Sequence, residues 1–160
     1  MSELIDKYLA TDLTLHLATG SYKFTDIHSD ALPQLPTPFV NSTWVVITAW
    51  NPASNDQVTF EQNAKAQAEL RVILESRYDA VFAARGDDSD PNSDYKGEEM
   101  LAVAVDPDEF EDDLFTEFTD LAEAYGQNAF FSVAGNVLRV HPGIEPDHIG
   151  QRVKAVVKIA

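Results

Sequence analysis

The sequence contains no cysteine among its 160 residues, which excludes disulfide bonds and metal sites that depend on thiolate ligands. It also lacks an apolar run near the roughly 18 residues that a membrane-spanning helix requires. The opening stretch, MSELIDKYLATD, has no basic segment followed by an apolar one, which is the pattern of a secretory signal. We therefore expect a cytoplasmic protein that does not associate with membranes.

Basic residues are scarce. The chain has 11 Lys and Arg against 27 Asp and Glu, and its formal net charge is −16. Because nucleic-acid binding depends on cations that neutralise phosphates, we expect no direct contact with nucleic acid. Two interpretations of this acidity stay open. It is either a solvated surface, of the kind seen in salt-adapted organisms, or the binding surface of an inhibitor that caps a basic protein partner.

The common catalytic signatures are also missing. The chain has no G-x-S-x-G elbow, no P-loop and no G-x-G-x-x-G motif. Its four histidines, His16, His28, His141 and His148, lack the spacing of converging zinc ligands. We therefore expect no cofactor.

What the chain does have is the composition of a globular protein, with 44% hydrophobic and 10% aromatic residues. No internal repeat or low-complexity linker divides it, so we expect a single domain over residues 1–160. Residues 44–133 should form its core, while residues 1–43 and 134–160 should contribute peripheral strands and loops.

Alternating or continuous apolar residues predict the strands. Residues 44–49 are apolar on consecutive positions, which indicates a central strand buried on both faces. A Gly135-Asn136 turn should join two late strands, and the lysine-bearing C-terminal end should form a protected sheet edge. A short amphipathic helix is expected over residues 3–9. The expected strands are LTLHLA, YKFTDI, residues 44–49, DAVFAAR, MLAVAV, NAFFSV, NVLRV and RVKAVVKIA.

Capping signals predict two main helices. Thr59 and Gln62 fit a capping box, and the stripe of Ala66, Leu70, Ile73 and Leu74 that follows also contains Asn63. The second helix has Asp106 as its cap, Pro107 in its first turn, Glu109 to complete the box and Gly126 as its stop. Its apolar face should consist of Phe110, Leu114, Phe118, Leu121 and Tyr125.

From residue 44 to 133 the expected order is strand, helix, strand, strand, helix, strand, the split β-α-β pattern of ferredoxin-like folds. We therefore predict an α+β two-layer sandwich. It should have a mixed or antiparallel sheet of five to seven strands, two main helices on one face, and extra strands from both termini.

Alternating chain direction should bring the unexplained polar residues to one edge of this sheet. They then form either a self-satisfied hydrogen-bond network or a cleft for a small polar or anionic ligand. In a cleft, Arg85 would bind an anionic group, and Glu98 would be the candidate general base or metal ligand. The runner-up function is the non-enzymatic acidic protein introduced above. The predicted ligand-binding residues are Thr48, Asn51, Asn63, Arg85, Glu98 and Gln127.

Four segments, ITAWNP, the downstream Asn63, GDDSDP…GEEML and YGQNAFF, resemble an uncharacterised bacterial family, domain of unknown function 3293. Its members combine a strand ending in T-A-x-N-P, a helix with an asparagine, a G-x-D-P loop before a glutamate, and a closing G-Q-x-A. The resemblance covers residues 44–133 and implies no activity, because none is established for the family. The loop is longer and more acidic here. The implied family positions are Thr48, Asn51, Pro52, Asn63, Glu98 (or Glu99), Gly126 and Gln127.

The acidic loop DSDPNSDYKGEE also matches, in part, the spacing of a calcium-binding loop. Its oxygen-bearing residues fall at offsets 1, 3, 5, 7 and 12. Ser93 occupies the position where glycine makes the sharp turn, and strands flank the loop instead of helices. We expect a solvated hairpin loop, with calcium as the weaker alternative. The candidate ligands are Asp88, Asp90, Asn92, Asp94 and Glu99.

Overall fold

The computed structural model describes residues 8–27, 34–50, 58–88, 97–106, 108, 114–147 and 149–159. Within this part of the chain, two helices are longer than one turn, α2 (Phe60–Glu75) and α4 (Phe115–Ala124), and a 3-10 turn, η1, covers Thr37–Phe39. The described strands are β1 (Thr11–Leu17), β2 (Gly20–Thr25), β3 (Thr43–Ile47), β4 (Phe82–Asp88), β5 (Glu98–Val105), β6 (Ala129–Ala134), β7 (Val137–Pro142), β8 (Gly150–Val153) and β9 (Ala155–Lys158).

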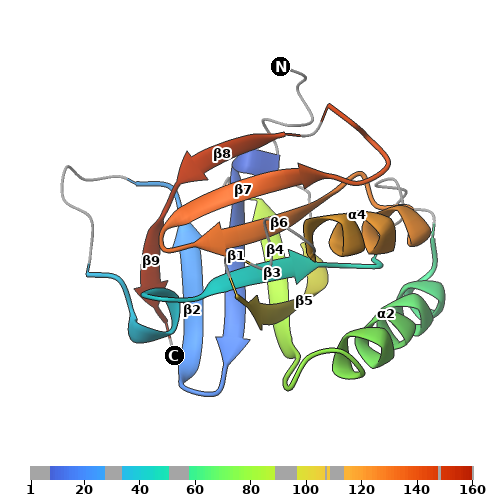
Figure 1. The fold of residues 1–160 in the computed structure, drawn as a ribbon, viewed down its shortest axis with the longest axis horizontal. Coiled ribbons are helices and arrows are strands. Elements are labelled where there is room, and N and C mark those ends of the chain that lie inside the picture. The colour runs from blue at the N-terminus through green and yellow to red at the C-terminus, as the bar shows by residue number, and fades with distance from the viewer. Residues whose placement is uncertain are drawn as a thin grey trace.

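The nine described strands form one sheet in the order β8-β7-β6-β3-β5-β4-β1-β2-β9, and every neighbouring pair is antiparallel. The sheet curls into a nearly closed barrel, with α2 and α4 together against one side of its outer wall (Figure 1). The prediction of a ferredoxin-like two-layer sandwich with five to seven strands is therefore wrong.

The reason lies in the terminal segments. β1, β2 and β9 extend the sheet beyond β4, and β7 and β8 extend it beyond β6. These added strands carry alternating apolar residues, which need burial on the face opposite α2 and α4. Because a wide antiparallel sheet twists, it can roll up and bury that face against itself. A two-layer sandwich would have left the same face in water.

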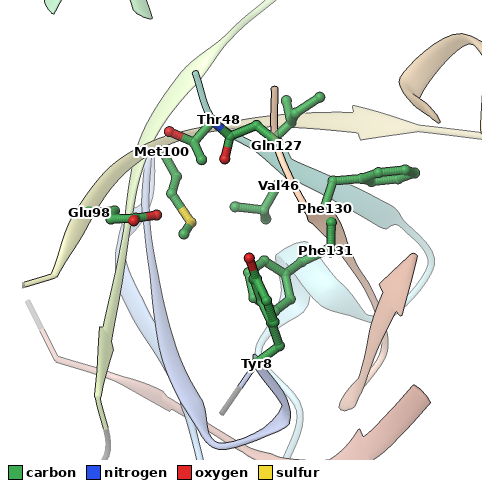
Figure 2. A pocket seen from close by; sticks show the side chains of 10 residues that line it. Tyr8, Val46, Thr48, Glu98, Met100, Gln127, Phe130 and Phe131 are labelled. Atoms are coloured by element: carbon green, nitrogen blue, oxygen red, sulfur yellow. The ribbon is translucent and has the colours of Figure 1, made fainter. Parts of the chain in front are cut away.

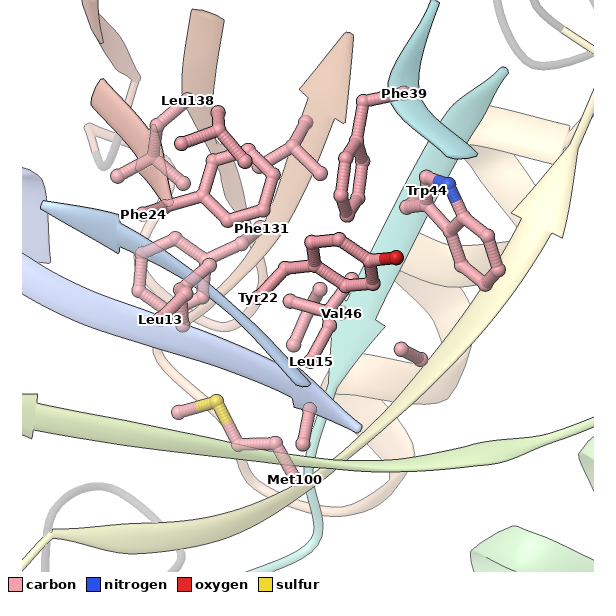
Figure 3. Packing of buried hydrophobic residues seen from close by; sticks show 14 of the residues in the cluster. Leu13, Leu15, Tyr22, Phe24, Phe39, Trp44, Val46, Met100, Phe131 and Leu138 are labelled. Atoms are coloured by element: carbon pink, nitrogen blue, oxygen red, sulfur yellow. The ribbon is translucent and has the colours of Figure 1, made fainter. Parts of the chain in front are cut away.

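The barrel has an inner and an outer core. The inner core packs side chains of facing strands against each other and includes Leu13, Phe24, Trp44, Val46 and Phe131 (Figure 3). The outer core lies between the wall and the helices, where Val45 and Ile47 pack with Leu70, Leu74 and Phe118. Successive residues of β3 thus enter different cores, which confirms the prediction of a central strand buried on both faces.

Lys154 lies where the two ends of the sheet, β8 and β9, approach each other, which we call the seam of the barrel. It separates β8 from β9, which follow each other in the chain but occupy opposite ends of the sheet. Its side chain is 0% exposed. The Nζ atom donates to the carbonyl of Thr11 (3.1 Å) and to Oδ1 of Asp26 (2.9 Å), while the backbone N–H donates to the carbonyl of Asn136 (2.8 Å). The predicted C-terminal edge strand is therefore two strands, one at each edge.

Charge attraction supports this seam. Burial lowers the pKa of Lys154, and its hydrogen bond with Asp26 partly offsets that effect. Burial by itself raises the pKa of Asp26, but attraction from Lys154 and Arg152 outweighs it and holds that pKa below its ordinary value. The lowered pKa of Asp26 favours its charged form, whereas burial of Lys154 opposes the charge of the lysine and Asp26 partly compensates for it.

The predicted capping box of α2 is confirmed, whereas α4 starts at Phe115, with Leu114 as its N-cap and no side-chain cap bond. The Thr59 hydroxyl accepts from the N–H of Gln62 (3.1 Å), and the Gln62 side chain accepts from the N–H of Thr59 (2.9 Å). Asp106 accepts from the N–H of Asp108 (2.9 Å), as a capping residue does, although Pro107, Glu109 and Phe110 lie outside the described residues. No helix in the described part of the chain is both long and apolar enough to cross a membrane.

Gly126 ends α4 as predicted. Its φ angle of 66° is the left-handed conformation that glycine adopts without strain. The N–H of Gln127 donates to the carbonyl of Ala122 (2.8 Å) and that of Gly126 to Glu123 (3.0 Å), which together make a Schellman motif. The turn delivers Gln127 directly to the start of β6.

Candidate functional site

The residues of interest gather at one end of the barrel, which we call the mouth. It is formed by the end of β3 and the starts of β5 and β6. Thr48, Glu98 and Gln127, one from each of these places, line a small cavity of about 10 Å³ together with Tyr8 and Met100 (Figure 2). The other described residues of the lining are apolar: Val46, Ile47, Ala129, Phe130 and Phe131. The structure thus brings together three of the six predicted binding residues.

Thr48 holds the wall of the mouth in place. Its hydroxyl donates to the carbonyl of Glu99 (2.7 Å) and accepts from the N–H of Trp50 (3.0 Å). These bonds satisfy the N–H of Trp50, which follows β3, and the carbonyl of Glu99 in β5. Thr48 is therefore a structural member of the mouth.

Gln67 is a member that the sequence analysis missed. Its Oε1 accepts from the N–H of Ala49 (2.8 Å), and its Nε2 donates to the carbonyl of Glu99 (3.0 Å). One side chain thereby ties α2 to the ends of two strands. The available signal was spacing, because Gln67 follows Asn63 by four residues and so lies on the same helix face.

The orientation of Gln127 follows from its partners. The side chain is buried, with 5% of the residue exposed, and its Nε2 donates to the carbonyls of Trp50 (3.1 Å) and Tyr125 (3.4 Å). Because both partners are acceptors, the nitrogen must face them. The amide oxygen then points toward the space between Glu98 and Tyr8 (Figure 2).

Of the predicted asparagines, the structure describes Asn63, which is not among the residues that line this cavity. Asn63 is 3% exposed in the first turn of α2, on the helix face that packs toward the barrel. Asn51 lies outside the described residues, as does its neighbour Pro52. A role for either residue in ligand binding stays a prediction.

Arg85 lies on the outer wall, away from the cavity lining. β4 continues three residues past it, to Asp88, so Arg85 is not at the strand end as the sequence suggested. Its guanidinium contacts Asp87 (3.1 Å) and Glu99 (3.0 Å). Glu98 and Glu99 are successive residues of β5 and face opposite sides of the wall.

Gly97 packs closely against this ion pair. Its φ angle is 82°, and a methyl group added to it would collide with Asp87 and with the guanidinium of Arg85. The backbone that leads into Glu98 therefore needs glycine at this position, for both conformation and space.

The proposed calcium loop lies largely outside the described residues, which omit Asp90, Asn92 and Asp94. Of its other candidate ligands, Asp88 ends β4 and Glu99 is paired with Arg85. Among the described residues, no three histidine or carboxylate side chains are placed to hold a metal ion together.

A serine–histidine pair also went unnoticed in the sequence. Ser132 Oγ lies 2.7 Å from Nε2 of His141, which faces it from β7. The His141 ring stacks on Phe130 and meets Phe115 edge-on. Burial, with a smaller contribution from the Arg139 charge, lowers the pKa of His141 to about 4. Ser132 is 1% exposed, so this pair is built as packing and not as an accessible nucleophile.

Comparison with known proteins confirms the resemblance seen in the sequence. Residues 47–130, 84 of the 160, match the model of a family described as protein of unknown function (DUF3293). The match starts inside β3 and ends inside β6, so it includes Thr48, Glu98 and Gln127. No curated protein and no solved structure matches the chain.

Proposed function

The chain belongs to the DUF3293 family, whose description states no activity, and from the geometry of the mouth we propose that it binds a small polar ligand there. One observation carries this proposal. Glu98, Gln127 and Tyr8, from separate parts of the chain, line one cavity at the end of a barrel whose inner core contains a large apolar cluster. Polar side chains that converge in an apolar setting are typical of ligand sites.

The three predicted residues would have different roles. Glu98 supplies a carboxylate and is the candidate general base should the ligand be turned over. Gln127 supplies an oriented amide oxygen. Thr48, together with Gln67, holds the backbone that surrounds them, so its substitution would disturb the site without removing a ligand contact. The cytoplasmic location expected from the sequence is part of the same proposal.

Glu98→Gln is the substitution that tests the site most directly, because it removes the charge and keeps the shape. A library of small polar metabolites, screened by thermal shift, should include compounds that raise the Tm of the wild-type protein and raise that of Glu98→Gln much less. Glu99→Gln is the matched control, since Glu99 is the adjacent residue on β5 but pairs with Arg85 outside the barrel. Compounds that bind both variants as well as wild type would place their site elsewhere.

A second candidate, an acidic protein that caps a basic partner, is favoured by the distribution of charge. Residues 137–160 contain two of the 27 acidic residues but four of the 11 basic ones, so the acidity is concentrated in residues 1–136. A pull-down at low and high ionic strength tests this candidate. An electrostatic partner should be basic and should dissociate as salt screens the attraction. A partner retained at high salt would contradict it.

A further inference from the structure

The outward side of α2 carries exposed apolar side chains. Phe60 and Val72, at 73% and 67%, are the two most exposed of the large apolar side chains that the structure describes. Ala64 and Ala68 lie between them at steps of four residues, so the four form one ridge about 18 Å long. The ring of Trp50 meets that of Phe60 edge-on at 5.5 Å and extends the apolar surface at one end. We call these five residues the α2 ridge.

The packing of α2 does not account for this ridge. The helix buries Asn63, Leu70 and Leu74 toward the barrel, and it leaves Phe60 and Val72 in water. An exposed helix position favours alanine, glutamate or lysine over valine, and the first turn favours acidic residues over phenylalanine. Large apolar side chains that are aligned in water against such local preferences are typical of a contact surface.

The surroundings of the ridge are acidic. Residues 60–79, which include α2, and residues 115–124 of α4 contain seven acidic and three basic residues. Arg71 and Arg77 already form ion pairs within this helix layer, and Lys65 is the third basic residue. A partner that covers the ridge should therefore be positively charged. A second copy of this acidic chain and an anionic membrane would both be repelled.

We propose that the α2 ridge docks a basic amphipathic helix of a partner protein. Residues four apart on one helix pack into the groove of another helix, and the small Ala64 and Ala68 would let the two helices approach closely. The apolar side of the partner would cover Phe60 and Val72, while its lysines and arginines would meet carboxylates such as that of Glu61. This inference rests on the second candidate function, for which it names the surface and the kind of partner, and it is independent of the mouth.

The test uses the whole chain and fluorescent peptides of leucine and lysine, each about 18 residues long so that a helix can span the ridge. The first peptide has its leucines on one helical face, the second has the same composition in scrambled order, and the third has glutamate in place of lysine. Fluorescence anisotropy should show binding of the first peptide. The other two should bind at least about tenfold more weakly.

Phe60→Ser and Val72→Ser each remove one large apolar side chain from the ridge. Because both side chains are exposed, the variants should keep the Tm of wild type, which is measured first. Each should bind the first peptide at least about tenfold more weakly, since the burial of an apolar side chain is lost. Val157→Ser is the matched control, because Val157 is also exposed (41%) but lies on β9, and it should bind as wild type does.

The remaining outcomes separate this inference from the second candidate function. If Phe60→Ser and Val72→Ser bind the first peptide as wild type does, or if the scrambled peptide binds equally well, charge alone causes binding. The inference is then wrong and the second candidate stands. If no peptide binds and the low-salt pull-down yields no basic partner, both are wrong. If the chain self-associates in analytical ultracentrifugation and Val72→Ser prevents this, a second copy occupies the ridge and the inference is wrong.

Discussion

His141 shows how a single residue responds to its surroundings. It is enclosed by Phe130 and Phe115, and its Nε2 bonds to Ser132 (2.7 Å). Because burial holds its pKa at about 4, against 6.5 for an ordinary histidine, the folded protein keeps this ring neutral where an unfolded chain would protonate it. Between pH 6.5 and about 4, His141 therefore binds a proton in the unfolded state but not in the folded state.

The stability contribution of His141 should consequently be complete above pH 6.5 and be lost as the pH falls toward 4. The slope is at most about 1.4 kcal/mol per pH unit, and the full loss about 3 kcal/mol. Urea unfolding of wild type and His141→Gln at several pH values measures it, and the variant should lose less stability on acidification. His16→Gln, at an exposed position, is the control. Equal pH profiles for all three proteins would contradict the expected effect.

At the scale of elements, the positions of β8 and β9 depend on one buried lysine. Lys154 is completely enclosed and bonds to Thr11 and Asp26, which belong to the other edge of the sheet. No apolar side chain could replace these bonds, although the aliphatic part of the lysine could be replaced. The strands at the seam thus owe their positions to a charge and not only to packing.

Lys154→Met should lower the free energy of unfolding by about 2–3 kcal/mol, because it leaves Asp26 without its main partner. Asp26 is partly exposed, which keeps the loss below that of a fully buried pair. Lys158→Met, at the exposed end of β9, should change stability by less than about 0.5 kcal/mol. Denaturant unfolding of both variants, of Asp26→Asn, and of Lys154→Met combined with Asp26→Asn measures the coupling between Lys154 and Asp26. Strictly additive losses would show that the two side chains do not act together.

Features that depend on residues close together in the sequence could be predicted. Features that depend on contacts between distant segments could not. The capping box of α2, the stop at Gly126 and the burial of β3 depend on residues a few positions apart. Gln67 and Ser132 were missed because their partners lie on other elements. Arg85 was placed at a strand end because the additional length of β4 has no clear apolar signal in GDD.

Sheet curvature is a property of the whole molecule. The order of strands and helices in residues 44–133 was predicted correctly, but the two-layer arrangement was wrong because it assumed a flat central sheet. Curvature arises from nine strands acting together and from a seam that joins residues far apart. The available sign was the alternation of apolar residues in both terminal segments, which already implied a second buried face.

The net charge of −16 also acts on the molecule as a whole. Repulsion among carboxylates opposes the compact state, and salt screens it, so the Tm should rise as sodium chloride is added. Glu69→Lys with Glu123→Lys, two exposed sites on α2 and α4, changes the formal charge from −16 to −12. This double variant should show a weaker rise than wild type. A salt dependence unchanged by the double variant would indicate that specific ion binding, and not screening, causes the effect.

The contact between Lys154 and Asp26 has a consequence for how the chain folds. It joins residues separated by 128 positions, so nearly all of the residues that form the barrel must be synthesised before this contact can form. Loops of that length close late, after the local hairpins are in place. Until then both sheet borders offer unpaired backbone groups to other chains, and the risk of aggregation ends when the lysine is buried.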